Sequence, residues 1–394
     1  MRFALAFLMM FGVAGVQSSV AQALSVGERL AADLTWTQAE RDVRFRRMET
    51  LFPVHRIRRG RRLRALPAGP VLLPPGDVQG FLQNEHMAGV LVLVDGRVRN
   101  EAYGLGLTRA GHWTSFSVSK AVTDTLAGVA IRNGSVHSLT DPVTAYLPEM
   151  RGSAYEGVTV RQLMTMTSGV RWNENYTTAD ADNVRLYTTP VASGLNSTIE
   201  YMRRLPREAA PGTRWKYNTG ETDLLGVLLQ RAAGRSLSEQ LRTAVWAKAG
   251  MERDATWITS SEGPAGQEFG GSGLSATLRD FGRLGLWVLR GGDGAVAPRW
   301  FAEAGSSQVK AGGAAYGYGW WPQKDGSFAA LGIFGQSILV DPSRHLVVVM
   351  LGDWDAAGGA AHSRARVSFW ESVKGAVDNE SLNAKGAKEV RQGR

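Results

Sequence analysis

The chain has 394 residues, a net charge of +9, 44% hydrophobic residues and no cysteine. Disulfides, thiolate nucleophiles and cysteine-linked lipids are therefore excluded, and stability must come from a packed core, which a chain of this length can form. The six histidines are scattered and form no His-Glu-x-x-His pattern, so no metal site is expected. The "YGLG" of residues 103–106 lacks the third glycine of a dinucleotide-binding turn, so no cofactor is expected either.

The first 23 residues have the order of a secretory signal peptide. Arg2 precedes an apolar stretch over residues 3–16, and the small-residue triplet Ala21-Gln22-Ala23 follows. We expect cleavage after Ala23 and a mature protein that is periplasmic or secreted. An uncleaved signal anchor is the alternative, although the apolar stretch is too short to span a membrane.

Residues 24–69 form a basic N-terminal arm with eleven arginines and five acidic residues. Most of the arginines lie in "VHRIRRGRRLR", residues 54–64, which has no aromatic residues between the basic ones. Nucleic-acid binding is therefore not expected. We expect a solvated segment that packs along the domain, and its arginines also suit weak contact with an anionic envelope surface.

A hairpin and a buried helix are expected next. Residues 86–104 contain two β-branched runs joined at Asp95-Gly96, which is a strong hairpin signal. Residues 115–131 carry apolar side chains at helical spacing. Helical patterns then dominate from 133 to about 259, with a polar loop over 172–198.

Strand patterns return near the C-terminus, at residues 316–321, 328–341 and 345–354. A closing amphipathic helix is expected over about 362–377, followed by a polar, frayed tail over 378–394.

Strands at both ends of the chain with helices between them predict an α+β fold. An antiparallel sheet would be flanked by N- and C-terminal helices, and an all-helical subdomain would be inserted over about 133–300. The whole catalytic domain is expected over 70–377.

Lys120 is unusual because it brings an amine into the first turn of an apolar helix. Ser117 lies three residues before it, so the two side chains share one face. A serine needs an adjacent base to act as a nucleophile, and a lysine serves as that base only when desolvation or nearby positive charge lowers its pKa. Ser-x-x-Lys is a known signature of such catalysis. The alternative is a surface ion pair of Lys120 with Asp124.

Neighbouring serines narrow the choice of nucleophile. Ser115 and Ser119 have valine three residues on, so neither has a lysine at the required spacing. A second match, Ser307 with Lys310, starts in a Gly-Ser-Ser stretch and precedes a glycine pair. We interpret this second match as a chance occurrence in a loop.

Tyr217 stands just before an apolar helix in "PGTRWKYNTGETDLLG", with Arg214 and Lys216 nearby. Cationic neighbours favour the phenolate, so this tyrosine can shuttle a proton. The alternative is an ordinary packing residue in front of a helix.

Gly332 interrupts the strand pattern "AALGIFGQSILV". A glycine in a strand permits close approach of another backbone or a ligand. The amides after it could provide one oxyanion donor, and the amide of Ser117 could provide the other. A plain core strand with a bulge is the alternative.

In this order, the motifs resemble those of the class C β-lactamase-related serine hydrolases, above all the 6-aminohexanoate-dimer (nylon oligomer) hydrolases and related esterases. The resemblance covers about residues 71–370 and rests on "SFSVSK", "LMTMTSGV", "YNTGETDLLG" and "GQSILVDPSRHLVVVM". It implies a β-lactamase/transpeptidase-like fold, with Ser117 as nucleophile, Lys120 as its base partner and Tyr217 as proton shuttle. The resemblance also implies an oxyanion hole made by the amides of Ser117 and Ile333.

Departures from the family pattern bear on the substrate. Thr219 stands where the family often has the asparagine of Tyr-x-Asn, and Ala330-Leu331-Gly332 replaces Lys-Thr-Gly. By the resemblance, that Lys-Thr pair holds the carboxylate of penicillins and muropeptides, which Ala-Leu cannot do. "WNENYTT" resembles the loop that carries a substrate-facing tyrosine in the nylon oligomer hydrolases, which nominates Tyr176.

The sequence therefore predicts a secreted serine hydrolase that cleaves a small ester or linear amide through an acyl-enzyme. The nucleophile elbow Gly-x-Ser-x-Gly of α/β-hydrolases is absent. A D-Ala-D-Ala peptidase or penicillin-binding-type envelope protein, or an inactive binding protein on the same fold, remain alternatives. The sequence leaves the oligomeric state open.

Overall fold

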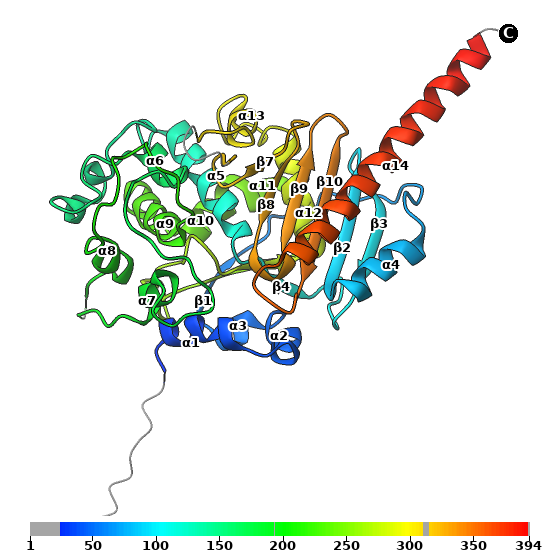
Figure 1. Cartoon of the computed structure of the whole chain (residues 1–394). Coiled ribbons are helices and arrows are strands. Elements are labelled where there is room, and N and C mark those ends of the chain that lie inside the picture. The colour runs from blue at the N-terminus through cyan, green and yellow to red at the C-terminus, as the bar shows by residue number, and fades with distance from the viewer. Residues whose placement is uncertain (1–23, 193, 310–314, 393–394) are drawn as a thin grey trace, which may run out of the picture.

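The computed structural model describes residues 24–192, 194–309 and 315–392, with side chains described up to residue 383. Two antiparallel sheets lie among helices (Figure 1). The expected signal peptide, residues 1–23, lies outside the described part of the chain. Within the part that is described, none of the helices has the length and apolar character needed to cross a membrane.

The larger sheet has the strand order β3-β2-β10-β9-β8-β7. It begins with the hairpin of β2 (Met87–Val94) and β3 (Arg97–Tyr103). Asp95 and Gly96 both have positive φ, 50° and 72°, as the short hairpin turn requires. The predicted hairpin is confirmed.

The C-terminal strands complete this sheet, but the single strand predicted over 328–341 is wrong. This segment forms two strands, β8 (Phe328–Leu331) and β9 (Ser337–Asp341), separated by the short helix η5 (Ile333–Gly335). Phe334 and Gly335 have φ of 59° and 98°, so the chain reverses here. The last strand, β10 (Leu346–Gly352), pairs with both β9 and β2.

The predicted strand over 316–321 is wrong, since only β7 (Trp321–Pro322) is extended and paired. Gly319 has φ of 74°, and a Cβ on it would lie 2.6 Å from the Cα of Ala121. The chain therefore bends closely around the buried helix instead of running straight.

Helices α4 (Pro75–Asn84) and α14 (Ala360–Gln392) cover one face of this sheet (Figure 1). Their apolar side chains pack on alternate residues of β2 and β10, including Val90 and Val348. The predicted end of the closing helix near residue 377 is wrong, because α14 continues to Gln392. Its tail, residues 378–394, is polar but contains no proline, and six of its residues are alanine, glutamate or lysine, which favour helix.

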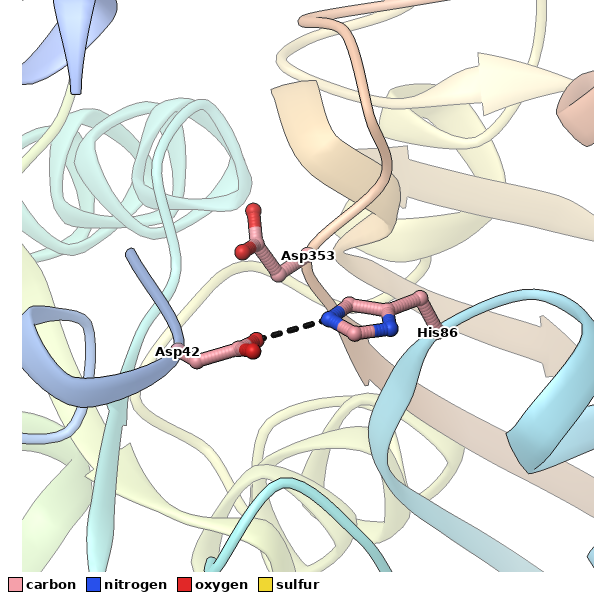
Figure 2. Close-up of side chains that lie close together, drawn as sticks. All are labelled: Asp42, His86 and Asp353. Atoms are coloured by element: carbon pink, nitrogen blue, oxygen red, sulfur yellow. Dashed lines mark hydrogen bonds and ion pairs between the residues drawn. The ribbon is translucent and has the colours of Figure 1, made fainter. Parts of the chain in front are cut away.

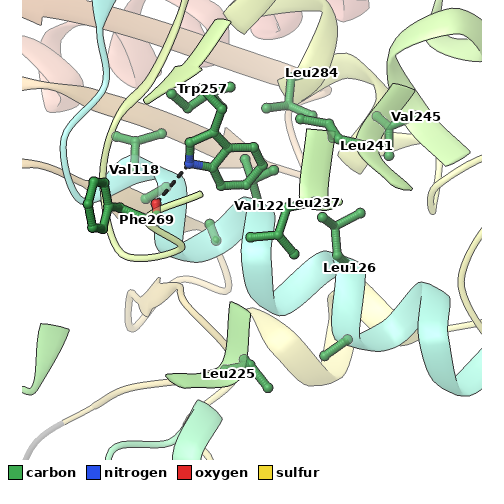
Figure 3. Close-up of a cluster of buried hydrophobic side chains, with 14 of the residues drawn as sticks. Val118, Val122, Leu126, Leu225, Leu237, Leu241, Val245, Trp257, Phe269 and Leu284 are labelled. Atoms are coloured by element: carbon green, nitrogen blue, oxygen red, sulfur yellow. Dashed lines mark hydrogen bonds between the residues drawn. The ribbon is translucent and has the colours of Figure 1, made fainter. Parts of the chain in front are cut away.

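The other face is covered by α5 (Val118–Asn133) and α12 (Leu278–Leu289). The predicted buried helix is confirmed, starting at Val118 rather than at residue 115. Figure 3 shows apolar side chains of α5, among them Val122 and Leu126, packed beside residues of neighbouring helices and loops. Gly282 of α12 lets that helix approach Leu91 of β2, since an added Cβ would lie 2.6 Å from its Cδ2.

The helical region of the chain is confirmed, but its predicted extent of about 133–300 is wrong. Strands β5 (Ala255–Ile258) and β6 (Leu274–Thr277) lie within it and form a smaller sheet of order β1-β5-β6-β4. Besides α12, the helices of the region between residues 133 and 300 are η2 (Val143–Ala145), η3 (Pro148–Met150), α6 (Val160–Met164), α7 (Asp182–Thr188), α8 (Ser197–Met202), α9 (Thr219–Ala233), α10 (Leu237–Leu241), η4 (Arg242–Trp246) and α11 (Ala247–Ala249). Helix α13 (Trp300–Ala304) follows at the end of this region. The predicted polar loop over 172–198 contains α7.

The basic arm is folded onto the domain. It forms α1 (Val26–Ala32), η1 (Asp33–Thr35), α2 (Gln38–Arg44), α3 (Met48–Leu51) and β1 (Val54–Ile57). Strand β1 pairs with β5 in the smaller sheet, which β4 (His112–Thr114) completes. The arm is therefore a structural part of the protein.

Several polar contacts fix α2 of the arm to the body, and two of them join charged or ionisable side chains. Arg41 Nε donates to Asp353 Oδ1 at 2.5 Å, and Asp42 Oδ1 lies 2.8 Å from Nε2 of His86 (Figure 2). Asp42, His86 and Asp353 also place ligand atoms within 4.8 Å of one another, an arrangement that a metal ion could use. Since they already bond to each other or to Arg41, we interpret the cluster as a clamp for the arm.

Candidate active site

Ser117 lies at the N-terminal end of α5, directly after a sharp turn. The amide of Ser115 donates to the carbonyl of Leu274 at 2.9 Å, which ties the approach to the smaller sheet. Phe116 then adopts a φ of 43°, a conformation rare for a large side chain. This turn places the half-buried Ser117 at the edge of a cavity rather than inside the core.

Lys120 is brought to Ser117 as the spacing predicts. Its Nζ donates to Ser117 Oγ at 2.8 Å and to the carbonyl oxygen of Gly271 at 2.8 Å. Only 1% of the lysine is exposed, and no ion pair of Lys120 occurs among the described residues. The alternative of a surface ion pair with Asp124 is therefore wrong. For the second Ser-x-x-Lys match, Lys310 falls outside the described residues.

Tyr217 packs beside the same lysine, whose Nζ lies 5.2 Å from the centroid of the ring. The ring of Tyr217 also stacks on an apolar neighbour, since the ring of Trp321 lies nearly parallel to it with 5.9 Å between the two centroids. The amide of Lys216 donates to the carbonyl of Met166 at 3.1 Å, so the "LMTMTSGV" segment holds the tyrosine loop. Arg214 pairs with Glu208 and Lys216 is exposed, whereas Lys120 is the cation that the structure places over the ring of Tyr217.

Gly332 brings the end of β8 against the turn before α5. A Cβ on this residue would lie 2.6 Å from the carbonyl oxygen of Ser115 and 3.2 Å from the amide nitrogen of Ser117. Ile333 follows and lines the cavity together with Ser117. Neither Ser117 nor Ile333 donates its amide to a carbonyl oxygen within the described chain. The predicted close approach at Gly332 is confirmed.

A cavity of about 60 Å³ opens beside Ser117. Tyr176 and Thr219, both nominated from the sequence, line it, and Glu174 joins them. Tyr176 donates its hydroxyl to Glu174 at 2.8 Å, and the Thr219 amide donates to Glu174 at 3.0 Å. A larger hollow of about 690 Å³ elsewhere includes none of Ser117, Lys120 and Tyr217 in its lining.

Asp223, which the sequence did not single out, holds the loop that positions Lys120. Its Oδ1 accepts from the amide of Gly271 at 2.7 Å, and its Oδ2 accepts from the hydroxyl of Tyr187 at 2.8 Å. Burial raises the pKa of Asp223 to about 6, although both hydrogen bonds and the charge of Lys120 oppose the rise. The "GETDLLG" pattern gave no signal for this role, because an aspartate near a helix start usually serves as a cap.

Comparison with known proteins places this fold and site in one family. The pattern of the Beta-lactamase family matches residues 77–368. A 6-aminohexanoate-dimer hydrolase of Paenarthrobacter ureafaciens is 30% identical over 343 residues, covering 79% of this chain and 84% of the relative. The chain belongs to the Beta-lactamase family, and it is a serine hydrolase of that family.

Solved structures agree on the fold. A Bacillus anthracis protein provisionally named a 6-aminohexanoate-dimer hydrolase has a TM-score of 0.75 at 19% identity, covering 86% of this chain and 94% of that one. A class C beta-lactamase has a TM-score of 0.55 at 18% identity, covering 76% and 94%. The predicted α+β, β-lactamase/transpeptidase-like fold is confirmed.

Proposed function

We propose that this hydrolase cleaves small esters or linear amides through an acyl-enzyme on Ser117. The observation that carries the proposal is the 2.8 Å separation between Ser117 Oγ and the buried Nζ of Lys120. When the amine is neutral, the same separation lets the serine hydroxyl donate its proton to the lysine as Oγ attacks the carbonyl.

The other groups fit the steps that follow. The developing oxyanion would accept hydrogen bonds from the amides of Ser117 and Ile333. Tyr217, next to Lys120, would pass a proton to the leaving oxygen or nitrogen, and the acyl-enzyme forms as that bond breaks. Water then attacks the acyl-enzyme, gives its proton to the same pair, and releases Ser117.

The end of β8 supports esters and linear amides over β-lactams. Ala330 is buried and Leu331 half-buried, and neither can pair with a substrate carboxylate. No lysine or arginine lines the cavity beside Ser117. The relationship to a 6-aminohexanoate-dimer hydrolase supports the same preference.

Fluorophosphonate labelling tests the nucleophile. We expect a fluorescent fluorophosphonate to label the wild type and not Ser117→Ala, with both proteins equally folded by circular dichroism. Ser307→Ala, from the chance second motif, is the matched control and should label normally. Labelling that persists in Ser117→Ala would refute the assignment, and a wild type that is never labelled would favour an inactive binding protein.

We also propose export, on the strength of the signal-like order of residues 1–23. Mature protein from a periplasmic fraction should begin at Leu24. An N-terminus at Met1 in that fraction would contradict cleavage.

A further inference from the structure

Residues 56–64 of the N-terminal arm contain six arginines and no acidic residue. All six arginines are exposed. Among the described residues, Arg56 forms one long ion pair, 3.7 Å from Asp254. The side chains of the other five make no ion pair or hydrogen bond with any described residue. We call residues 56–64 the arginine stretch, and most of its charge has no described partner within the chain.

The backbone of the arginine stretch is fixed on the body of the protein. The amide of Arg59 donates to Asp254 Oδ1 at 2.9 Å. Further along, the amide of Arg64 donates to the carbonyl of Gly250 at 2.9 Å, and the carbonyl oxygen of Arg64 accepts from Nε of the buried Arg283 at 2.9 Å. The arginine side chains therefore start from a fixed path, so a partner that binds them need order only the side chains.

The neighbouring part of the chain adds positive charge. Gly60 lies against α11, since a Cβ on it would lie 2.2 Å from the carbonyl oxygen of the first residue of that helix. Lys248 and Arg253 follow there, and both are exposed. The acids of this loop, Glu252 and Asp254, already accept hydrogen bonds from groups of the protein. The arginine stretch with Lys248 and Arg253, which together we call the basic face, is therefore strongly positive.

An apolar side chain is exposed within the basic face. Leu63 stands between Arg62 and Arg64, and 55% of it is exposed. Cations beside an exposed aliphatic side chain suit an anionic lipid surface, where phosphate groups lie next to hydrocarbon. Single-stranded nucleic acids also carry charge but are bound by aromatic stacking, and residues 54–64 contain no phenylalanine, tyrosine or tryptophan. The chemistry of this surface therefore favours a lipid membrane over a soluble polyanion.

We propose that the basic face is a docking surface for anionic phospholipid membranes, with Leu63 entering the lipid interface. Each arginine near such a surface strengthens binding by about fivefold. Because the attraction is mainly electrostatic, docking is reversible and is weakened by salt. The inference does not depend on the acyl-enzyme at Ser117, since it concerns where the hydrolase is held and not what it cleaves.

Sedimentation with vesicles tests the proposal. The protein is mixed with vesicles of phosphatidylglycerol and phosphatidylcholine in equal parts, and with vesicles of phosphatidylcholine alone. At low salt, we expect the wild type to bind the anionic vesicles at least about a hundredfold more tightly. Replacing Arg58, Arg59, Arg61 and Arg62 together by glutamine should lower that binding at least about thirtyfold, because four of the cations are lost.

The matched control replaces four exposed arginines outside the basic face that form no described ion pair, so the net charge falls equally. It combines Arg132→Gln, Arg151→Gln, Arg235→Gln and Arg364→Gln, and it should bind within about threefold of the wild type, because these charges lie away from the docked surface. Leu63→Ser should weaken binding to the anionic vesicles at least about threefold. It should leave binding to heparin, a soluble polyanion, unchanged.

Three results would overturn the proposal. The first is a wild type that shows no preference for anionic vesicles, or a preference that high salt does not weaken, and this measurement needs no variant to fold. The second is an equal loss of binding in the two fourfold variants, with both shown to be folded by circular dichroism. The third is tight binding to heparin without binding to vesicles, which would assign the basic face to a soluble polyanion.

Discussion

The carboxylate of Asp223 and the backbone of Gly271 are joined at 2.7 Å, and the carbonyl oxygen of that same glycine lies 2.8 Å from Lys120 Nζ. Asp223 thus acts on Ser117 through two intermediates without touching it. We expect Asp223→Ala to lower kcat for p-nitrophenyl butyrate at least about tenfold, because Gly271 and Lys120 lose their fixed geometry.

Asp223→Asn separates position from charge. The amide oxygen of asparagine can still accept from Gly271, so this variant should recover most of the lost kcat. Steady-state kinetics on both variants check the prediction, which would be contradicted if Asp223→Asn were as inactive as Asp223→Ala.

Gly332 is the second position at which a small change should disable the site. A methyl group there would lie 2.6 Å from the carbonyl oxygen of Ser115, so the backbone on one side must shift. We expect Gly332→Ala to cost about 1–3 kcal/mol of stability and to lower kcat/KM about a hundredfold, the effect of losing one oxyanion donor. Gly76→Ala is the control, since its Cβ would meet no atom within 4 Å. Equal kinetics for the two variants would remove Gly332 from the catalytic geometry.

Substrate preference follows from Ala330 and Leu331. A penicillin carboxylate placed against them would be desolvated without a partner, whereas a short ester brings no charge. We predict that kcat/KM for p-nitrophenyl butyrate exceeds that for benzylpenicillin by at least about a hundredfold, or about 2.7 kcal/mol. Hydrolysis of benzylpenicillin as fast as the ester would mean that a cation such as Lys216 holds the carboxylate, and Lys216→Ala would then identify it.

Asp33, a buried acid at the start of η1 that lines the cavity beside Ser117, should make the stability of the protein depend on pH. Its pKa is raised from 3.8 to about 8, so the folded protein keeps a proton on Asp33 that the unfolded chain releases as pH rises through this window. The unfolding free energy of the wild type therefore falls with pH in this window, relative to Asp33→Asn, which does not titrate. Between about pH 5 and pH 8, we expect urea unfolding to show Asp33→Asn gaining about 1–3 kcal/mol over wild type. A difference that stays constant with pH would show that Asp33 is ionised throughout.

Local patterns were enough to predict much of the fold. Asp95-Gly96 between β-branched runs determines the β2–β3 hairpin, and the apolar period over Val122 and Leu126 determines α5. Predictions from local patterns failed at two places where tertiary contacts determine the path of the chain. The strand predicted over 316–321 fails because Gly319 wraps closely around α5, and η5 divides 328–341 because Phe334 takes a positive φ that a strand pattern does not reveal.

The site divides in the same way. Ser117 and Lys120 lie one helical turn apart, so spacing alone brings them together. Tyr217 stood out by its cationic neighbours, and the resemblance to a family assigned it the role of proton shuttle. The sequence also suggested Arg214 as a cation near that tyrosine, but the structure pairs it with Glu208. Asp33 could not be found, because it reaches the cavity from the N-terminal arm. Asp223 lies within the quoted tyrosine motif, but its partner Gly271 is 48 residues further along the chain, so the sequence does not reveal their contact.

The match to the Beta-lactamase family begins at residue 77, whereas Asp33, Leu30 and Leu34 stand before it and still form part of the cavity wall. The reacting groups and this wall are thus encoded in separate stretches of the gene. Substitutions in the leading stretch can change which acyl groups fit without altering Ser117, Lys120 or Tyr217. A chain trimmed to the matched residues would lose both β1 and this part of the cavity wall. If it remained active, we would expect it to accept a wider range of acyl groups.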